Sequence, residues 1–499
     1  MVLLVVLVVI VLLTLAAMTF SQLMLTEREG VEVAGSQSQA REAANSGIEQ
    51  ARAFLMQTSE VQQEASGWYD NPTQFRGAMV IDSADPRRRA RFTLVAPKQE
   101  NGVAMGIRYG LEDESGRLNL NAILAADKLQ SGAGRTMLMK LPGMTEQTAD
   151  AILDWLDADD TPREQGAETE YYSALGSPYA CKNGPLDTIE ELLLVRGVTP
   201  DLLFGADANR NGMADAGEPS PDASGAADTA EGTMTGGWAE DLTLYSIETN
   251  LKSDGTPKID VNQSDLKKLQ KSLQDALNQD WATFIIAFRQ NGPYTGDKPG
   301  QTSPAGTLDY TQAAKTKLTT ILDLVGQKTQ VKFEGQKDLV VLECPFSSQP
   351  GQMGSYLPKL VENLTTNSLA VVPGRVNINQ ASKLVLTAIP GMTDEIADQI
   401  ITRRPQDPNQ TDSLHQNETW LLTDGIVTLE QMKKLLPFIC TKGAVYRTQA
   451  VGFFDGGGPA ARIEAVLDTT AQPARVLVWR DITNLGRGYP LETLGTEIY

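Results

Sequence analysis

The chain has 499 residues, of which 41% are hydrophobic and 21% charged, which describes a foldable protein of about two to four domains. Its net charge of -20 disfavours contact with nucleic-acid phosphates. One histidine (His415) and three scattered cysteines, which allow one disulfide at most, disfavour histidine or cysteine catalysis and zinc binding, so any bound metal would be an oxygen-liganded ion such as Ca²⁺.

The N-terminus is predicted to span a membrane. Residues 1–26 contain no charged side chain, and about 20 apolar residues in a helix cross a hydrocarbon core. The segment lacks the basic start and small-residue cleavage site of a secretory signal, and it is apolar on every face, unlike a core helix. Residues 27–63 keep helix formers with apolar side chains at helical spacing, which predicts an amphipathic continuation of the same helix.

Two groups of strands are predicted, far apart in the chain. Alternating apolar positions mark residues 91–97 and 103–113, and then 445–454, 461–468 and 475–481. No strand is expected between the two groups. The middle of the chain is therefore interpreted as a large, mainly helical insertion between strands of one sheet, which makes the fold class α+β.

The middle region repeats itself. Residues 118–121, 259–262 and 376–379 share the order apolar, polar, apolar, Asn. Residues 141–145 and 389–393 share the pattern apolar-Pro-Gly-Met-Thr, each ahead of an apolar helix. This resembles the helix-hairpin-helix module, in which a glycine turn joins two short helices.

Many such hairpins bind DNA phosphates through the amides of a Pro-Gly-apolar-Gly turn. Here Thr145 and Thr393 stand at the second glycine, and acidic residues follow them (Glu146 and Asp394). A carboxylate at the turn opposes phosphate binding, so a packing module is favoured over DNA contact. The basic run of residues 87–91 is similarly interpreted as a solvated loop.

An EF-hand-like loop is predicted at residues 207–218. Oxygen ligands fall at loop positions 1, 3, 5, 9 and 12, with Gly212 at position 6 for the sharp bend and a backbone carbonyl at position 7. Pro219 and Pro221 block an exiting helix, so the loop is expected to bind Ca²⁺ structurally rather than to open as a sensor. The proposed ligands are Asp207, Asn209, Asn211, Met213, Asp215 and Glu218.

A second acidic cluster precedes this loop. Its closely spaced carboxylates repel one another unless a cation or an arginine intervenes, so a second Ca²⁺ site and a solvated helix end paired with Arg163 are both open. A carboxylate pair for glycoside hydrolysis is conceivable, but nothing in the sequence sets the separation that it requires. The candidate ligands are Asp157, Asp159, Asp160, Glu168 and Glu170.

These features together resemble a known family. The aliphatic N-terminal helix is followed by residues 154–159 (Asp-Trp-x-Asp-x-Asp), residues 166–172 (Gly-Ala-Glu and Tyr-Tyr), Pro178-Tyr179, Asn183 and the Glu190–Gly197 stretch. The combination resembles the K-type minor pseudopilins of type II secretion systems, most densely over residues 118–200.

The resemblance implies a type IV pilin-like fold, Ca²⁺ in an inserted helical domain and no enzymatic activity. It also implies a single-pass inner-membrane protein whose C-terminal body lies in the periplasm, at the pseudopilus tip, with I-type and J-type minor pseudopilins as partners and no nucleic acid. Ordinary pilins carry a glutamate at the fifth mature position. If Met1 is the mature start, that position is Val5, as expected for a subunit with nothing stacked above it.

The expected organisation is a span, a helical extension, two halves of a pilin-like domain, and an insertion. A membrane-tethered DNA receptor built from the hairpin modules is the alternative, and a membrane-anchored hydrolase that depends on Asp157 is a third reading. The pairing of Cys344 with Cys440 stays open. The expected segments are 1–26, 27–63, 64–117, 118–440 (modules near 118–200, 257–290 and 376–436, and an acidic calcium-loop linker at 205–256) and 441–499.

Overall fold

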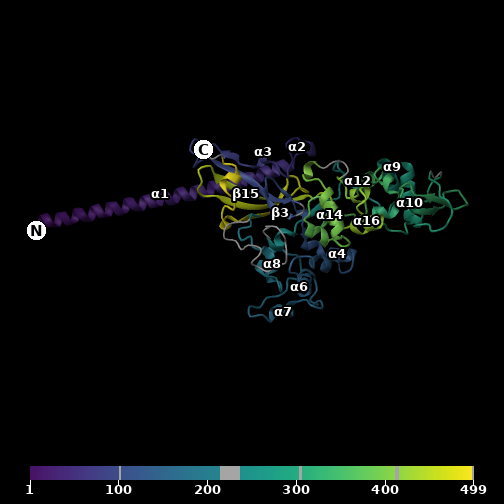
Figure 1. The fold of residues 1–499 in the computed structure, drawn as a ribbon, viewed down its shortest axis with the longest axis horizontal. Helices are drawn as coiled ribbons and strands as arrows, with labels where there is room; N and C mark the ends of the chain where they lie inside the picture. Colours follow the sequence, from purple (N-terminus) through teal and green to yellow (C-terminus); the bar gives the residue numbers. More distant parts are fainter. Residues whose placement is uncertain (101–102, 214–235, 303–305, 411–414, 497–499) are drawn as a thin grey trace.

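The computed structural model describes residues 1–100, 103–213, 236–302, 306–410 and 415–496. They form a long N-terminal helix, an antiparallel sheet packed on the second half of that helix, and a mainly helical insertion between the strands (Figure 1). This arrangement confirms the predicted α+β, pilin-like fold.

Helix α1 (Val2–Leu55) joins an exposed apolar segment to a sheet-packing segment. Its N-terminal half is apolar and exposed, and among the described residues it is the one helix long and apolar enough to cross a membrane. Its C-terminal half buries small side chains against the sheet. The approach is so close that a Cβ on Gly452 would lie 1.9 Å from the Ala40 carbonyl oxygen.

The long helix ends before residue 63, which corrects the predicted boundary. Its last turn is at Leu55, and a separate short helix, α2 (Ser59–Glu64), follows. The Gln62 side-chain amide donates to the carbonyl oxygens of Leu55 (3.2 Å) and Gln57 (3.0 Å), so it satisfies carbonyls at the end of α1. The next helix is α3 (Pro72–Phe75).

The sheet has the strand order β1-β2-β15-β16-β17, with β3 paired to β2 and β4 paired to β15, and all pairings are antiparallel. Strands from both ends of the chain therefore pair in one sheet, as predicted. The predicted strand at 103–113 is instead two strands, because Gly110 approaches the Trp68 backbone too closely for a Cβ and Leu111 donates to the Trp68 carbonyl. The strands are β1 (Ala78–Ile81), β2 (Ala90–Glu100), β3 (Val103–Arg108), β4 (Glu112–Asp113), β15 (Val445–Phe454), β16 (Ala461–Asp468) and β17 (Arg475–Asp481).

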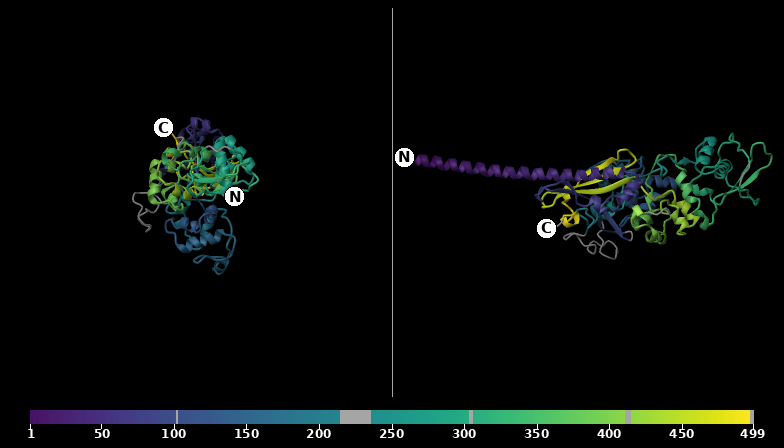
Figure 2. Two further views of the ribbon diagram at one scale, coloured as in Figure 1. Left: turned by 90° about the vertical axis from the view of Figure 1, so that its right-hand side faces the viewer. Right: turned by 90° about the horizontal axis from the view of Figure 1, so that it is seen from above.

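The insertion lies at the end of the sheet away from the N-terminus and along one side of it (Figures 1 and 2). One continuous hydrophobic core runs through it, separate from the core between α1 and the sheet. Its helices are α4 (Ile123–Leu129), α5 (Ala133–Leu138), α6 (Glu146–Leu156), α7 (Thr169–Ser173), α8 (Pro200–Phe204), α9 (Leu266–Ala276), α10 (Gln279–Asn291), α11 (Pro350–Met353), α12 (Leu357–Asn363), α13 (Lys383–Ala388), α14 (Asp394–Arg403), α15 (Trp420–Thr423) and α16 (Leu429–Leu435). Helix α17 (Leu491–Leu494) follows the last strand.

The expectation of no strands inside the insertion is wrong. Short two-stranded pairings occur there because each module closes its chain ends by a few ladder hydrogen bonds. The strands are β5 (Leu118–Asn119), β6 (Leu242–Thr243), β7 (Ile247–Thr249), β8 (Ile259–Asp260), β9 (Lys328–Val331), β10 (Val340–Glu343), β11 (Leu364–Thr365), β12 (Val371–Pro373), β13 (Val376–Asn377) and β14 (Ile439–Cys440).

The three sequence repeats have one structural role. Each begins with a short strand that pairs in parallel with a later strand: β5 with β6, β8 with β11, and β13 with β14. The asparagine that ends each repeat then clamps a distant backbone. Asn121 donates to the Leu186 carbonyl (3.0 Å) and accepts from the Leu186 amide (2.8 Å), and Asn262 does the same with Leu318 (2.9 and 3.0 Å). Asn379 donates to the His415 carbonyl (3.0 Å).

The two Pro-Gly turns also serve packing. Gly143 and Gly391 adopt positive φ, and the threonine two residues later caps the next helix. The Thr145 hydroxyl accepts from the Thr148 amide (3.1 Å), and the Thr393 hydroxyl accepts from the Ile396 amide (3.3 Å). A threonine at the second glycine position is thus explained as a helix cap, and these capped amides are not available to phosphate.

Candidate metal site and interdomain network

Three carboxylates gather at the end of α6. Asp154 lies in the last turn of α6, Asp157 is the C-cap of that helix, and Glu168 approaches both as the N-cap of α7. One oxygen from each of the three carboxylates lies within 4.8 Å of the others. The returning loop passes so close that a Cβ on Gly166 would lie 1.8 Å from Asp154 Oδ2, so only glycine fits there.

Arg163 neutralises one charge of this cluster. Its Nη1 donates to Asp154 Oδ1 (2.6 Å) and to Asp157 Oδ2 (2.5 Å), and its backbone amide also donates to Asp154. The sequence left open whether a cation or Arg163 offsets the charge of this cluster, and Arg163 is paired with it in the structure. It leaves the cluster with two net negative charges.

Glu168 is the unusual member of the cluster. Its side chain is 3% exposed, and neither carboxylate oxygen has a hydrogen-bond partner. Burial, followed by the negative charges of Asp154, Asp157 and Asp160, raises its pKa from 4.5 to about 7. The Cys181 thiol lies beside it, a weak donor whose own pKa burial raises to about 12. A buried carboxylate without partners beside other acids is the environment that a bound cation stabilises.

The donors fit Ca²⁺ rather than a softer metal. All three side chains offer hard carboxylate oxygens, and the excess of two negative charges equals the charge of a divalent cation. Asp154, Asp157 and Glu168 would hold such an ion and, with it bound, would cease to repel one another. Asp157 is already bound by Arg163, so it is not placed as a free acid or base.

The predicted second site is only partly brought together. Asp157 and Glu168 meet, whereas the Asp159 carboxylate accepts from the Thr161 amide (2.9 Å) and the Asp160 carboxylate accepts from the Thr169 amide (3.3 Å). Glu170 is exposed on α7. The sequence prediction left Asp154 out of the candidate ligands, although its place three residues before Asp157 in the same acidic stretch was a signal for it.

The predicted calcium loop is described as far as Met213, and Asp215 and Glu218 lie outside the described residues. Asp207 is buried and accepts from the amides of Asn211 (3.1 Å) and Gly212 (2.8 Å). Gly212 adopts φ +70°, as the predicted sharp bend requires. Ca²⁺ at this loop stays a prediction.

This loop is docked on the sheet. The buried Arg462 of β16 donates to the backbone carbonyls of Asn209 (2.7 Å) and Arg210, and Asn211 donates its side-chain amide to the Gly488 carbonyl (2.6 Å). Gln449 of β15 also donates to the Arg210 carbonyl (3.1 Å). The described part of the loop is therefore a structural connection between the insertion and the sheet.

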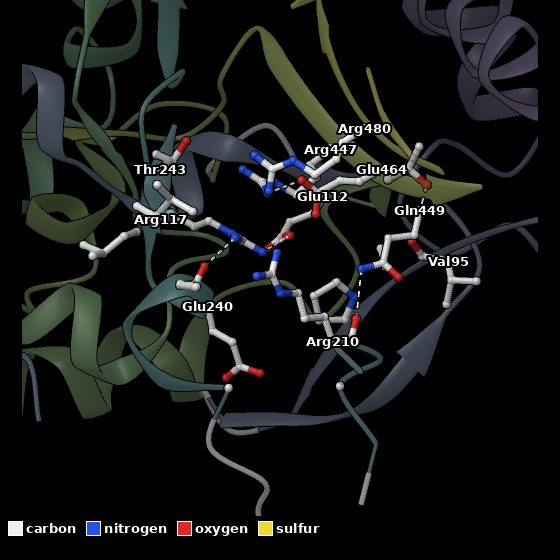
Figure 3. Close-up of a pocket in the computed structure, with 18 of the residues that line it drawn as sticks. Val95, Glu112, Arg117, Arg210, Glu240, Thr243, Arg447, Gln449, Glu464 and Arg480 are labelled. Atoms are coloured by element: carbon white, nitrogen blue, oxygen red, sulfur yellow. Dashed lines mark hydrogen bonds and ion pairs between the residues drawn. The ribbon is translucent and has the colours of Figure 1, made fainter. Parts of the chain in front are cut away.

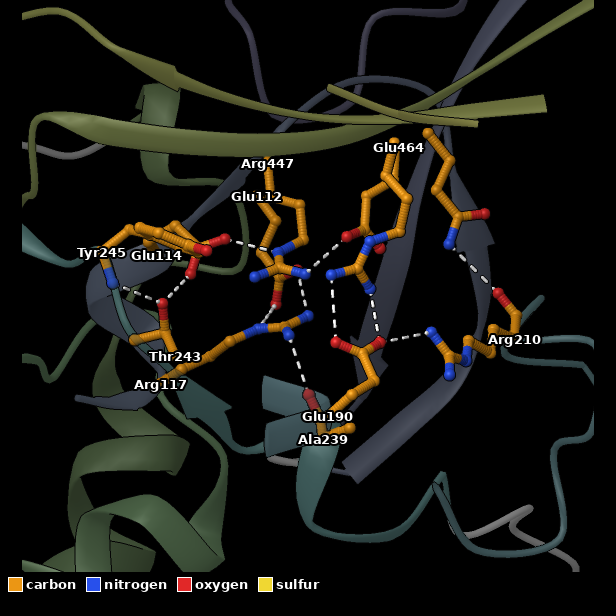
Figure 4. Close-up of polar contacts among 12 residues, drawn as sticks. Glu112, Glu114, Arg117, Glu190, Arg210, Ala239, Thr243, Tyr245, Arg447 and Glu464 are labelled. Atoms are coloured by element: carbon orange, nitrogen blue, oxygen red, sulfur yellow. Dashed lines mark hydrogen bonds and ion pairs between the residues drawn. The ribbon is translucent and has the colours of Figure 1, made fainter. Parts of the chain in front are cut away.

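A polar network joins the insertion to the sheet around a cavity of about 140 Å³ (Figure 3). On one side Arg480 and Arg210 both bind Glu190, with Arg480 Nη1 at 2.5 Å and Arg210 Nη1 at 3.1 Å (Figure 4). Burial alone would raise the pKa of Glu190, but backbone hydrogen bonding and Arg480 hold it below its usual value.

The other side of the network is more deeply buried. Arg117 binds Glu112 through two hydrogen bonds (3.1 and 2.5 Å), and Arg447 binds the fully buried Glu114 (Figure 4). At the cavity mouth Glu240 has no arginine at salt-bridge distance among the described residues, and burial with the neighbouring Asp241 raises its pKa to about 7. The network offers paired charges that fix orientation rather than a free nucleophile or base.

Comparison with known proteins finds one family model that matches part of this insertion. Residues 116–204, which include the three-carboxylate cluster and Glu190, match the family model of type II secretion system (T2SS), protein K. This segment is similar to type II secretion system protein K, and we call it the protein K domain after the matched family. The resemblance predicted from the sequence is thereby confirmed.

Two curated relatives are both called type II secretion system protein K. The one from Pectobacterium carotovorum subsp. carotovorum is 27% identical over 172 residues, which cover 30% of this chain and 51% of the relative. The one from Pseudomonas aeruginosa is 34% identical over 97 residues, which cover 18% of this chain and 29% of the relative. The chain thus spans about half, or less, of the curated relatives that it matches.

A solved structure also aligns with the chain. It is a chain from the crystal structure of the GspK-GspI-GspJ complex of the enterotoxigenic Escherichia coli type 2 secretion system, with a TM-score of 0.35 and 11% sequence identity. The alignment covers 92% of this chain and 98% of that chain.

Proposed function

We propose that this protein is a K-type minor pseudopilin that caps the tip of a type II secretion pseudopilus. It is held in the inner membrane by α1, with its body in the periplasm, and it acts by assembly rather than by catalysis. Its partners are I-type and J-type minor pseudopilins. The protein K domain and the continuous helix from membrane span to pilin-like sheet both support this assignment.

The position of the insertion carries the tip assignment. The protein K domain and the two further helical modules lie beyond and beside the end of the sheet that faces away from the membrane span (Figures 1 and 2). A subunit stacked on that end would have to occupy the same space. The part of α1 between the proposed span and the sheet is left exposed for partner helices, with Val31 73% exposed and Val33 56% exposed.

Calcium is proposed as a structural cofactor of the protein K domain. Asp154, Asp157 and Glu168 would bind it, and the bound charge would stabilise the turn between α6 and α7. Because Glu190 lies in the same domain and binds Arg480 of β17, a stiffened domain also keeps its orientation on the sheet.

Two measurements test this assignment. Tagged full-length protein is recovered from detergent-solubilised native membranes with Ca²⁺ or with EDTA, and its partners are identified by mass spectrometry. Two or three small pilin-like proteins are expected, in lower yield with EDTA. Recovery of nucleic acid without such partners would instead support the DNA-receptor alternative.

The second measurement separates a tip subunit from a shaft subunit. Immunogold labelling of assembled fibres is expected to mark one end only. Labelling at intervals along the fibre would refute the tip position while leaving membership in the assembly intact. Glu168→Gln is expected to reduce the Ca²⁺-dependent recovery of partners, and the exposed Glu170→Gln serves as the matched control.

A further inference from the structure

A large groove separates the protein K domain from the other helical modules. Its volume is about 730 Å³, within the usual range of ligand clefts. Helix α4 and Met137 near the end of α5 form one wall, and the opposite wall comes from β7, residues 317–321, residues 364–375 and residues 436–438. We name this feature the intermodule groove.

The intermodule groove is positively charged although the chain is strongly acidic. Lys128, Lys258 and Lys317 line it, and among the described residues none of these three ammonium groups forms a salt bridge. Three lysines gathered around one cleft of a chain with net charge -20 make that cleft locally more positive than the chain as a whole.

The carboxylates in the groove do not cancel this charge. Glu248 and Glu418 share Arg375, whose Nη1 lies 2.5 Å from Glu248 Oε2 and whose Nη2 lies 2.7 Å from Glu418 Oε1. These three residues together carry one net negative charge. The three lysines add three positive charges, so the lining has two net positive charges.

The groove also exposes apolar surface. Leu129 on α4 and Leu369 on the opposite wall are each 57% exposed, and no described leucine outside α1 is more exposed. Covering leucine side chains that are this exposed on both walls with another apolar group lowers the free energy of the system. A ligand that fits must therefore combine apolar side chains with negative charge.

We propose that the intermodule groove binds an extended acidic peptide segment of another protein, with carboxylates facing Lys128, Lys258 and Lys317 and apolar side chains covering Leu129 and Leu369. Nucleic acid fits less well, because two carboxylates lie in the wall and the one aromatic side chain among the described lining residues, Phe438, is only 7% exposed and offers no face for base stacking. This binding site is independent of the tip assignment, since it requires only the groove.

Fluorescence anisotropy of the full-length protein in detergent tests the site. The probes are labelled decapeptides that alternate leucine with glutamate, and matched decapeptides that alternate leucine with glutamine or with lysine. The glutamate peptides are expected to bind at micromolar concentration, more weakly as salt is raised. Equal binding of the glutamine peptides, or no binding of the glutamate peptides, would overturn the proposal.

Variants locate the binding. Lys258→Glu with Lys317→Glu is expected to weaken binding of the glutamate peptides about tenfold or more, which corresponds to about 1.4 kcal/mol. Lys332→Glu with Lys337→Glu makes the same charge change at exposed positions outside the groove and is expected to have little effect. Equal loss in both double variants, or stronger binding of a single-stranded oligonucleotide than of the peptides, would refute the site.

Discussion

Replacement of Glu168 by glutamine tests two effects on the free energy of unfolding: the destabilisation caused by a buried charge and the stabilisation caused by a bound cation. The Glu168 carboxyl has a pKa of about 7 in the folded protein, against its ordinary 4.5. A difference of this size corresponds to about 3 kcal/mol of differential stabilisation between the two protonation states. Because the side chain is 3% exposed, solvent screening reduces this figure little.

The direction of the pH dependence follows from the raised pKa. Below pH 4.5 the carboxyl is protonated in the folded and unfolded chains alike, so it contributes no difference. Between 4.5 and about 7 only the folded state keeps the proton, and stability without metal falls as the pH rises. Above about pH 7 the full destabilisation of about 3 kcal/mol is present.

In EDTA at pH 8, Glu168→Gln is therefore expected to raise the free energy of unfolding, by about 1 to 3 kcal/mol after the cost of burying an amide. At pH 5 the gain should largely disappear. Ca²⁺ should narrow this difference, because a hundredfold excess over the dissociation constant stabilises the wild type by about 2.7 kcal/mol. The variant should gain less, having lost one carboxylate ligand.

Differential scanning fluorimetry of the full-length protein in detergent, at pH 5 and pH 8, with EDTA or CaCl₂, measures these differences. Glu170→Gln, on the exposed side of α7, controls for charge removal. If Ca²⁺ raises the melting temperature of Glu168→Gln as much as that of the wild type, the cation binds elsewhere. If the variant is less stable than the wild type in EDTA at pH 8, the reasoning about the buried charge is wrong.

Three further substitutions test contacts between segments of the fold. Gly452→Ala should cost at least about 2 kcal/mol, because the new Cβ would meet the Ala40 carbonyl oxygen; Gly176→Ala, in open space, should cost less than about 0.5 kcal/mol by thermal unfolding. Arg462→Met should cost about 2 to 4 kcal/mol and make the loop after α8 sensitive to limited proteolysis, because buried carbonyls lose their donor; unchanged proteolysis would contradict this. Glu240→Gln should raise stability at pH 8 but not at pH 5, since burial raises this pKa to about 7; an equal gain at both pH values would argue against charge burial.

Local sequence patterns determined the elements of this protein. An uncharged aliphatic run predicts that the start of α1 can cross a membrane, because every side chain of such a helix must be apolar. Alternating apolar residues located β15, β16 and β17, and the two distant groups of strands revealed that an insertion interrupts one sheet. The end of α1 at Leu55 was missed, because a cap by Gln62 depends on the path of the chain after the helix.

Only the tertiary structure decided which polar residues act together. The sequence placed Asp157 and Glu168 in one acidic stretch, but the return of the chain past Gly166 selected them with Asp154 and left Asp159 outside. The charge of the intermodule groove likewise comes from lysines that are far apart in the chain. Burial, pKa and the pairing of charges depend on distances between segments, and those distances are set by packing rather than by neighbouring residues.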